Sequence, residues 1–91
     1  MIDEEKVAET LKEWLENPYW AAYYDGAPSK ACKQYVALSF YANDMEDEEA
    51  FAEMDQLEDK LDLSDWKHLL RFSGNDPNKV KIQKKIAEME Q

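Results

Sequence analysis

Apolar side chains recur every three or four positions along most of this chain, which is the spacing of an amphipathic helix and not of a strand. The pattern breaks at a few turn-forming residues, so it predicts five or six short helices and no strand. The first predicted helix runs from its N-cap Asp3 to Glu16. The second runs from Pro18 to Asp25, and Gly26 ends it.

In the middle of the chain, the apolar spacing predicts two longer helices. The first of these runs from about Ser29 to Ala42. Asn43 or Asp44 is the predicted cap of the next helix, which ends near Leu61. Its apolar stripe recurs at helical spacing, as expected for one face turned toward a core.

In the last third of the chain, the apolar spacing predicts a short helix and then a final one. Ser64 is the predicted cap of the short helix, and Gly74 closes it. Asp76 followed by Pro77 is the predicted start of the final helix. Because the connections are short, the helices are expected to form one compact all-α bundle, a single domain over residues 1–91.

The inward-facing positions of these helices define a predicted core. In the third helix, Tyr41 is expected on the outer side, together with Lys30 and Lys33. The predicted core consists of Val7, Leu11, Trp14, Leu15, Tyr35, Val36, Leu38, Phe51, Met54, Leu57, Trp66, Leu69, Leu70, Ile82 and Ile86.

The length of the chain limits what it can enclose. A domain of 91 residues has a modest core, in which a large enzyme cleft does not fit easily. No stretch approaches the roughly 18 apolar residues that span a bilayer, and the acidic N-terminus lacks the apolar run of a signal peptide. These features predict a cytoplasmic protein that does not contact a membrane.

Charge is concentrated in one stretch of the chain. Residues 44–65 carry 11 acidic side chains and one basic one, whereas residues 66–91 carry six basic and three acidic ones. The formal net charge of −10 disfavours direct binding of nucleic acid or anionic lipid, and it favours a basic partner. The helix dipole explains acids at the start of the predicted fourth helix, but not those toward its end.

Acidic residues of this stretch are candidate contacts for such a partner. Two structural explanations stand beside that hypothesis: a solvated face, or a last helix whose lysines pack alongside. A narrower functional alternative is that the carboxylates mimic nucleic-acid phosphates, as small phage-encoded inhibitors of nucleases or repressors do. The candidate acidic residues are Glu49, Glu53, Asp55 and Asp59.

Aromatic residues gather on the second predicted helix. Four of them fall within an arc of roughly 140° at 100° per residue. This face either packs on Trp14 and Tyr35 as part of the core, or stays exposed as a contact patch. Exposure would predict a homodimer or an apolar partner. The candidate aromatic residues are Tyr19, Trp20, Tyr23 and Tyr24.

Residues suited to chemistry are scarce. His68 is the only histidine, and we expect it to face solvent or to be partly packed, although Asp65 shares its helix face. Ser64 and Ser73 are more simply a cap and a turn residue than nucleophiles. Cys32 lies on an apolar helix face, where burial makes a thiol inert.

The usual metal and cofactor patterns also fail. One cysteine and one histidine do not make a zinc set, and they do not supply the motifs of a di-iron bundle. A calcium loop counted from Asp44 has Glu49 where glycine is required. With only Gly26 and Gly74 in the chain, a glycine-rich phosphate loop is excluded. The sequence thus predicts no catalytic residue, no cofactor and no metal.

Together these features favour a small non-enzymatic protein-interaction or regulatory accessory protein over an enzyme. Its expected partner is another protein, with basic character, and a homodimer is a second option. The alternative function is an acidic, nucleic-acid-mimicking inhibitor of a nucleic-acid-binding protein, of the phage or mobile-element type.

Overall fold

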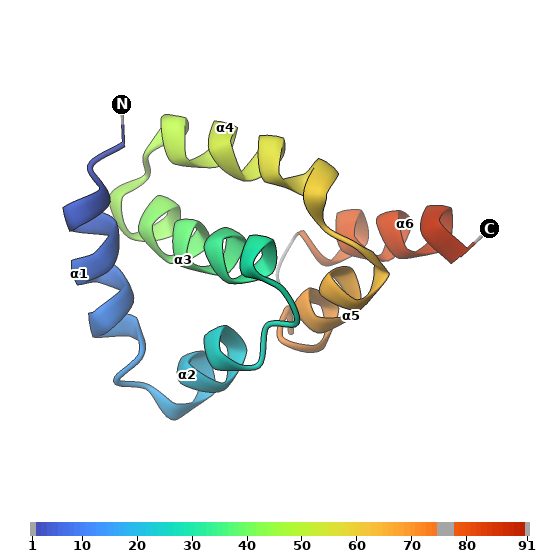
Figure 1. Cartoon of the computed structure of the whole chain (residues 1–91), viewed down its shortest axis with the longest axis horizontal. Coiled ribbons are helices and arrows are strands. Elements are labelled where there is room, and N and C mark those ends of the chain that lie inside the picture. Colours follow the sequence, from blue (N-terminus) through green and yellow to red (C-terminus); the bar gives the residue numbers. More distant parts are fainter. Residues whose placement is uncertain (1, 75–77, 91) are drawn as a thin grey trace.

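Helices form wherever the apolar spacing predicts them. The computed structural model describes residues 2–74 and 78–90, and within these residues it contains six α-helices, one 3-10 turn and no strand. The predicted all-α fold is therefore confirmed (Figure 1). The helices are α1 (Glu4–Trp14), α2 (Pro18–Asp25), α3 (Lys30–Met45), α4 (Glu48–Leu57), α5 (Leu63–Arg71) and α6 (Lys79–Glu90), with the 3-10 turn Glu58–Lys60 after α4.

The first helix starts follow their predicted caps. The side chain of Asp3 accepts hydrogen bonds from the backbone N–H groups of Glu5 and Lys6, at 3.0 and 3.3 Å. Pro18 occupies the first turn of α2, and Gly26 caps its C-terminal end, as the sequence predicts. The side chain of Asn17 accepts from the backbone N–H of Tyr19 at 2.9 Å at the start of α2, so both starts satisfy backbone donors that have no partner within the helix.

The junction between α3 and α4 differs from the prediction. Asn43 does not cap α4, because its side-chain amide donates to the Ser39 carbonyl at 2.7 Å and stays within α3. Asp44 also belongs to α3, which continues to Met45. Asp47 is the cap of α4, since its carboxylate accepts from the backbone N–H groups of the next turn.

The following boundary was also predicted wrongly. The helix α4 ends at Leu57 and not near Leu61, because the chain tightens into the 3-10 turn. Asp62, not Ser64, caps α5, and Asp65 completes a reciprocal capping box with it. The helix α5 ends at Arg71 with Phe72 as its C-terminal cap, so Gly74, at φ 53°, lies beyond the helix end and does not close it as predicted. The predicted start at Asp76 and Pro77 lies outside the described residues.

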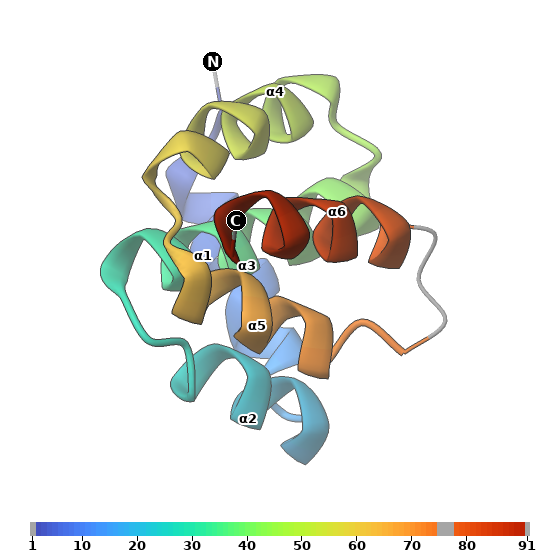
Figure 2. The ribbon, with the colours of Figure 1, turned by 90° about the vertical axis from the view of Figure 1, so that its right-hand side faces the viewer.

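The helix α3 occupies the centre of the molecule (Figure 1). It packs against α1, α2 and α4, while α5 and α6 pack against each other. Figure 2 shows α5 and α6 side by side at the end of the molecule opposite α1. No helix in the described part of the chain is long and apolar enough to cross a bilayer.

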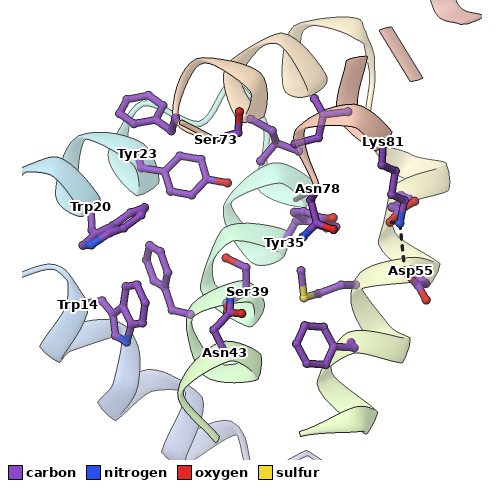
Figure 3. A pocket seen from close by; sticks show the side chains of 17 residues that line it. Trp14, Trp20, Tyr23, Tyr35, Ser39, Asn43, Asp55, Ser73, Asn78 and Lys81 are labelled. Carbon is purple, nitrogen blue, oxygen red and sulfur yellow. Dashed lines mark hydrogen bonds and ion pairs between the residues drawn. The ribbon is translucent and has the colours of Figure 1, made fainter. Parts of the chain in front are cut away.

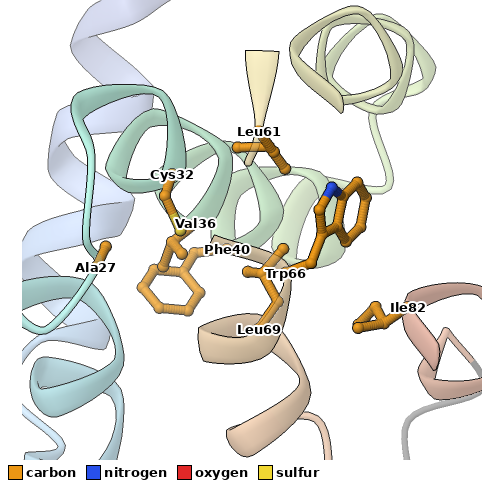
Figure 4. Close-up of a cluster of buried hydrophobic side chains, with 8 residues drawn as sticks. All are labelled: Ala27, Cys32, Val36, Phe40, Leu61, Trp66, Leu69 and Ile82. Carbon is orange, nitrogen blue, oxygen red and sulfur yellow. The ribbon is translucent and has the colours of Figure 1, made fainter. Parts of the chain in front are cut away.

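Two clusters of buried side chains hold these helices together. The larger joins α3 to α5 and α6 through Val36, Phe40, Trp66, Leu69 and Ile82, among others (Figure 4). The smaller lies between α3 and α4. The predicted core residues buried in these clusters are Val36, Leu38, Met54, Leu57, Trp66, Leu69 and Ile82. Those only partly buried are Val7, Leu11, Trp14, Leu15, Tyr35, Leu70 and Ile86.

Three large side chains depart from the predicted core. Phe40, which was not assigned to the core, is only 2% exposed, and Tyr41, expected on the outer side, is also buried. Phe51 was assigned to the core but is 41% exposed. The Tyr41 hydroxyl donates to Asp47 at 3.3 Å, and burial followed by the charge of Asp47 raises the pKa of Tyr41.

Glu46 offers a direct test of the α3–α4 junction. It is the one non-glycine residue with positive φ in the part of the chain that the structure describes, at 52°. Because a side chain crowds the backbone in this conformation, we expect Glu46→Gly to raise the free energy of unfolding by about 0.5–1 kcal/mol. Urea denaturation measures this, with Asp44→Gly in the last turn of α3 as the control. The control should lose about 1 kcal/mol, and losses in both variants would refute the assignment.

Candidate functional site

Three of the four candidate aromatic residues, Trp20, Tyr23 and Tyr24, are partly buried and pack against the core. The ring centroid of Trp20 lies 5.4 Å from that of Trp14 and 5.7 Å from that of Phe40. The ring of Tyr23 stacks on His68 at 5.5 Å. The structure thus gives these residues the packing role that the sequence offered as one alternative. Trp20 packs on Trp14, as expected, and also on Phe40, while Tyr23 packs on His68.

Only Tyr19 among the four candidates is exposed, and both Tyr19 and Tyr24 have a polar or charged partner. Tyr19 is 47% exposed, and its hydroxyl donates to the backbone carbonyl of Phe72 at 3.0 Å. The Lys33 ammonium lies 5.5 Å from the centroid of the Tyr24 ring. The aromatic face of α2 is therefore divided between core and surface, and it does not form one exposed patch.

The four candidate acidic residues, Glu49, Glu53, Asp55 and Asp59, are all exposed. Asp55 has a partner on the last helix, because the Lys81 ammonium lies 3.7 Å from its carboxylate and 2.6 Å from that of Glu58. The hydrogen bond to Glu58 raises the pKa of Lys81 and so holds its charge. At Asp55, therefore, the acidic stretch is explained structurally, because a lysine of the last helix packs alongside it.

A first cavity lies where α2, α3, α4, the residues just after α5 and the start of α6 approach one another (Figure 3). We call it the aromatic cleft, and its volume is about 270 Å³. It brings together Trp20, Tyr23 and Asp55 from the two separately predicted surfaces. Its other aromatic lining residues are Trp14, Phe40, Phe51, Tyr35 and Phe72. Its other polar lining residues are Ser39, Asn43, Glu58, Ser73, Asn78 and Lys81.

A second cavity lies on the other side of α3 and α4, between them and the start of α1. We call it the acidic groove, and its volume is about 670 Å³. The groove has apolar lining residues Ile2, Val7, Ala37 and Leu38. Its acidic lining residues are Asp3, Glu4, Glu5 and Glu53. Gln34 completes the lining, and no basic side chain is found among the described residues that form it.

The two cavities use different faces of the same helices. On α3, Ser39 and Asn43 face the cleft, whereas Gln34 and Leu38 face the groove. Of the predicted candidates, only Glu53 reaches the groove, and Tyr19, Tyr24, Glu49 and Asp59 line neither cavity. One sequence signal pointed toward the groove: Ile2 and Val7 flank the Asp3 cap at the spacing of a hydrophobic staple.

His68 is buried, which corrects the expectation that it faces solvent or is partly packed. Its Nε2 lies 2.6 Å from the backbone carbonyl of Tyr23 and tethers α5 to α2. Asp65 does not orient it, since the Asp65 carboxylate is bound by Ser29 and by the backbone N–H of Asp62. These contacts give His68 and Asp65 structural roles.

The remaining candidate groups are also in structural positions. Cys32 is fully buried, as predicted, and burial together with the charges of Asp65 and Asp62 raises the pKa of its thiol to about 12. At neutral pH this group stays a thiol. Ser73 donates to the Leu70 carbonyl at 2.8 Å, which is the turn role expected of it. In residues 2–74 and 78–90, no three histidine, cysteine or acidic residues are grouped so as to hold a metal ion.

No protein-family model, no curated protein and no solved structure matches this chain. The functional inference therefore depends on the two cavities and on the charges that surround them. The groove offers carboxylates above an apolar floor, and the cleft offers aromatic rings beside a carboxylate–lysine cluster.

Proposed function

We propose that this chain is a small protein-interaction module without catalytic activity, which binds a basic segment of another protein in the acidic groove. One observation carries the proposal: four carboxylates border a cavity with an apolar floor, and no basic residue lines it among those described. An apolar side chain of the partner fits the floor, and lysine or arginine side chains on either side of it meet the carboxylates.

The dipole of α1 accounts for only part of this charge. Asp3, Glu4 and Glu5 lie at the start of α1, where negative charge is favourable, and Asp3 is also its cap. Glu53 belongs to the middle of α4 and has no such reason to face the same cavity. Its position is what makes the groove acidic on two sides.

The negative charge of the chain favours a basic partner in two ways: by faster association and by rejection of acidic competitors. A net charge of −10 attracts a cationic segment, and exposed charges interact over about 10 Å at 0.1 M salt. Such attraction raises the association rate and rejects acidic competitors more than it raises affinity. The affinity itself comes from apolar area buried against Val7, Ala37 and Leu38.

The alternative function is an acidic decoy, in which the carboxylates mimic nucleic-acid phosphates and do not border a groove for a peptide. It needs a row of carboxylates along α4, but Lys81 already neutralises part of that row at Asp55 and Glu58. The decoy predicts that Asp55→Lys together with Asp59→Lys abolishes binding. The groove proposal predicts that this pair has only the weak effect of changing the net charge.

A labelled synthetic peptide with a central leucine between lysines tests the proposal by fluorescence anisotropy. We expect salt-sensitive binding that weakens when leucine is replaced by serine. The groove double variant Glu5→Gln with Glu53→Gln should weaken it roughly tenfold. The matched control, Glu9→Gln with Glu13→Gln, changes the net charge equally on exposed residues outside both cavities. Equal losses in the two double variants, or no loss in either, would overturn the proposal.

A further inference from the structure

The aromatic cleft is a compact site of a different kind from the groove. At about 270 Å³ it lies just below the range of roughly 300–1,000 Å³ in which proteins hold drug-sized ligands. Its space admits one small molecule and not a length of peptide. Figure 3 shows Trp14, Trp20 and Tyr23 on one side of it and Asp55 and Lys81 on the other.

The floor of the cleft offers hydrogen-bond acceptors. The Ser39 hydroxyl donates to the Val36 carbonyl at 2.6 Å, and the Asn43 side-chain amide donates to the Ser39 carbonyl at 2.7 Å. The single hydroxyl proton of Ser39 is therefore used inside α3, and so is one of the two amide protons of Asn43. The side-chain oxygens of both residues remain acceptors in the cavity that they line, and a ligand with N–H or O–H donors meets both of them.

The charges around the cleft favour a cation over an anion. Lys81 is held by Glu58, whose side chain is nearly buried, at 2.6 Å. Asp55 lies further from Lys81, at 3.7 Å, and its side chain is 71% exposed. The cluster keeps one negative charge in excess, and the whole chain carries ten.

From these three features we propose that the aromatic cleft binds a small protonated amine that carries a ring or a short alkyl chain. The apolar part lies against Trp14, Trp20 and Phe40. The ammonium group donates to Ser39 or Asn43 and approaches Asp55. This site is separate from the acidic groove and does not depend on the proposed binding of a protein partner.

Three probes of similar shape and different charge test the ligand class: 2-phenylethylamine, 2-phenylethanol and phenylacetate. Binding is followed by the indole N–H signals in nuclear magnetic resonance spectra of the full chain. We expect the amine to shift the signals of Trp14 and Trp20 saturably, and Trp66, which does not line the cleft, to stay in place. The alcohol should bind several-fold more weakly and the carboxylate more weakly still. Equal binding of amine and alcohol, or no saturable shift, would reject the proposal.

Surface variants identify the group that recognises the charge without endangering the fold. Asp55→Asn should weaken amine binding about two- to fivefold, and Lys81→Gln should strengthen it by a similar factor. Asp59→Asn, which removes an exposed acid outside the cleft, should change nothing. Identical losses in Asp55→Asn and Asp59→Asn would contradict the site. The groove variant Glu5→Gln with Glu53→Gln should leave amine binding intact, so the two proposals fail separately.

Discussion

Replacement of Phe40 by alanine is expected to lower the free energy of unfolding by about 3–5 kcal/mol, the range for removal of a buried phenylalanine. Phe40 is 2% exposed and stacks on Trp14, with ring centroids 4.6 Å apart and an angle of 11° between the planes. Trp20 and Tyr23 meet the same ring edge-on, at 5.7 and 6.0 Å. The truncation therefore leaves a cavity that four elements surround, and it removes three ring contacts.

Urea denaturation followed by tryptophan fluorescence measures this loss. Small domains are stable by about 5–15 kcal/mol, so Phe40→Ala should remove a large share of the total stability. Phe51→Ala is the matched control, because Phe51 is exposed at the edge of the aromatic cleft. It should lose less than about 1 kcal/mol. A similar loss at both positions would mean that Phe40 does not occupy the centre of the ring cluster.

Phe40 is buried and Phe51 is exposed, which is the reverse of what helical periodicity predicts for them. A pattern of apolar positions predicts one buried stripe, which suits a helix at the edge of a bundle. The helix α3 has neighbours on several sides, α1, α2 and α4, so residues outside the stripe, including Tyr41, are also buried. The helix α4 lies at the edge of the bundle, and its buried apolar stripe is narrower than the sequence predicts, because it leaves Phe51 exposed.

The helix ends were predictable where a single capping residue was available. Asp3, Pro18 and Gly26 each take their predicted role, and Asn17 beside Pro18 supplies the side-chain cap of α2. Between α3 and α4 several capping residues compete, and the left-handed conformation of Glu46 decides in favour of Asp47. Local sequence does not predict that backbone conformation for a glutamate, because non-glycine residues rarely adopt it.

The cavities depended on contacts between distant segments, which single-sequence patterns do not contain. The aromatic and acidic candidates were chosen as two surfaces, but folding brings Trp20 and Asp55 into one cleft. Glu5 was explained by the α1 dipole, and only the approach of α4 places Glu53 across the groove from it. Residue types were therefore predictable, whereas their grouping required the fold.

The buried carboxylate of Asp65 joins two helix starts, and its removal is the second change with a large expected effect. Ser29, the cap of α3, donates its hydroxyl to both Asp65 oxygens at 3.0 Å, and the Asp62 backbone N–H donates to one of them at 3.0 Å. Asp65 is 1% exposed, and Asp65→Ala removes the charged acceptor of both donors, of which Ser29 is half-buried. We expect it to lower the free energy of unfolding by about 2–4 kcal/mol.

Ser64→Ala provides the matched control, because Ser64 is the neighbouring residue that the sequence nominated as the cap. A capping serine loses about 0.5–2 kcal/mol on replacement by alanine, whereas an exposed serine without that role changes stability by less than about 0.5 kcal/mol. We expect the smaller value, since Asp62 caps α5 and Ser64 is exposed. A double-mutant cycle of Asp65→Ala with Ser29→Ala should give a coupling of roughly 0.5–3 kcal/mol. Additive losses would show that the two helix starts are stabilised independently, because a shared hydrogen bond makes the second loss smaller once the first partner is gone.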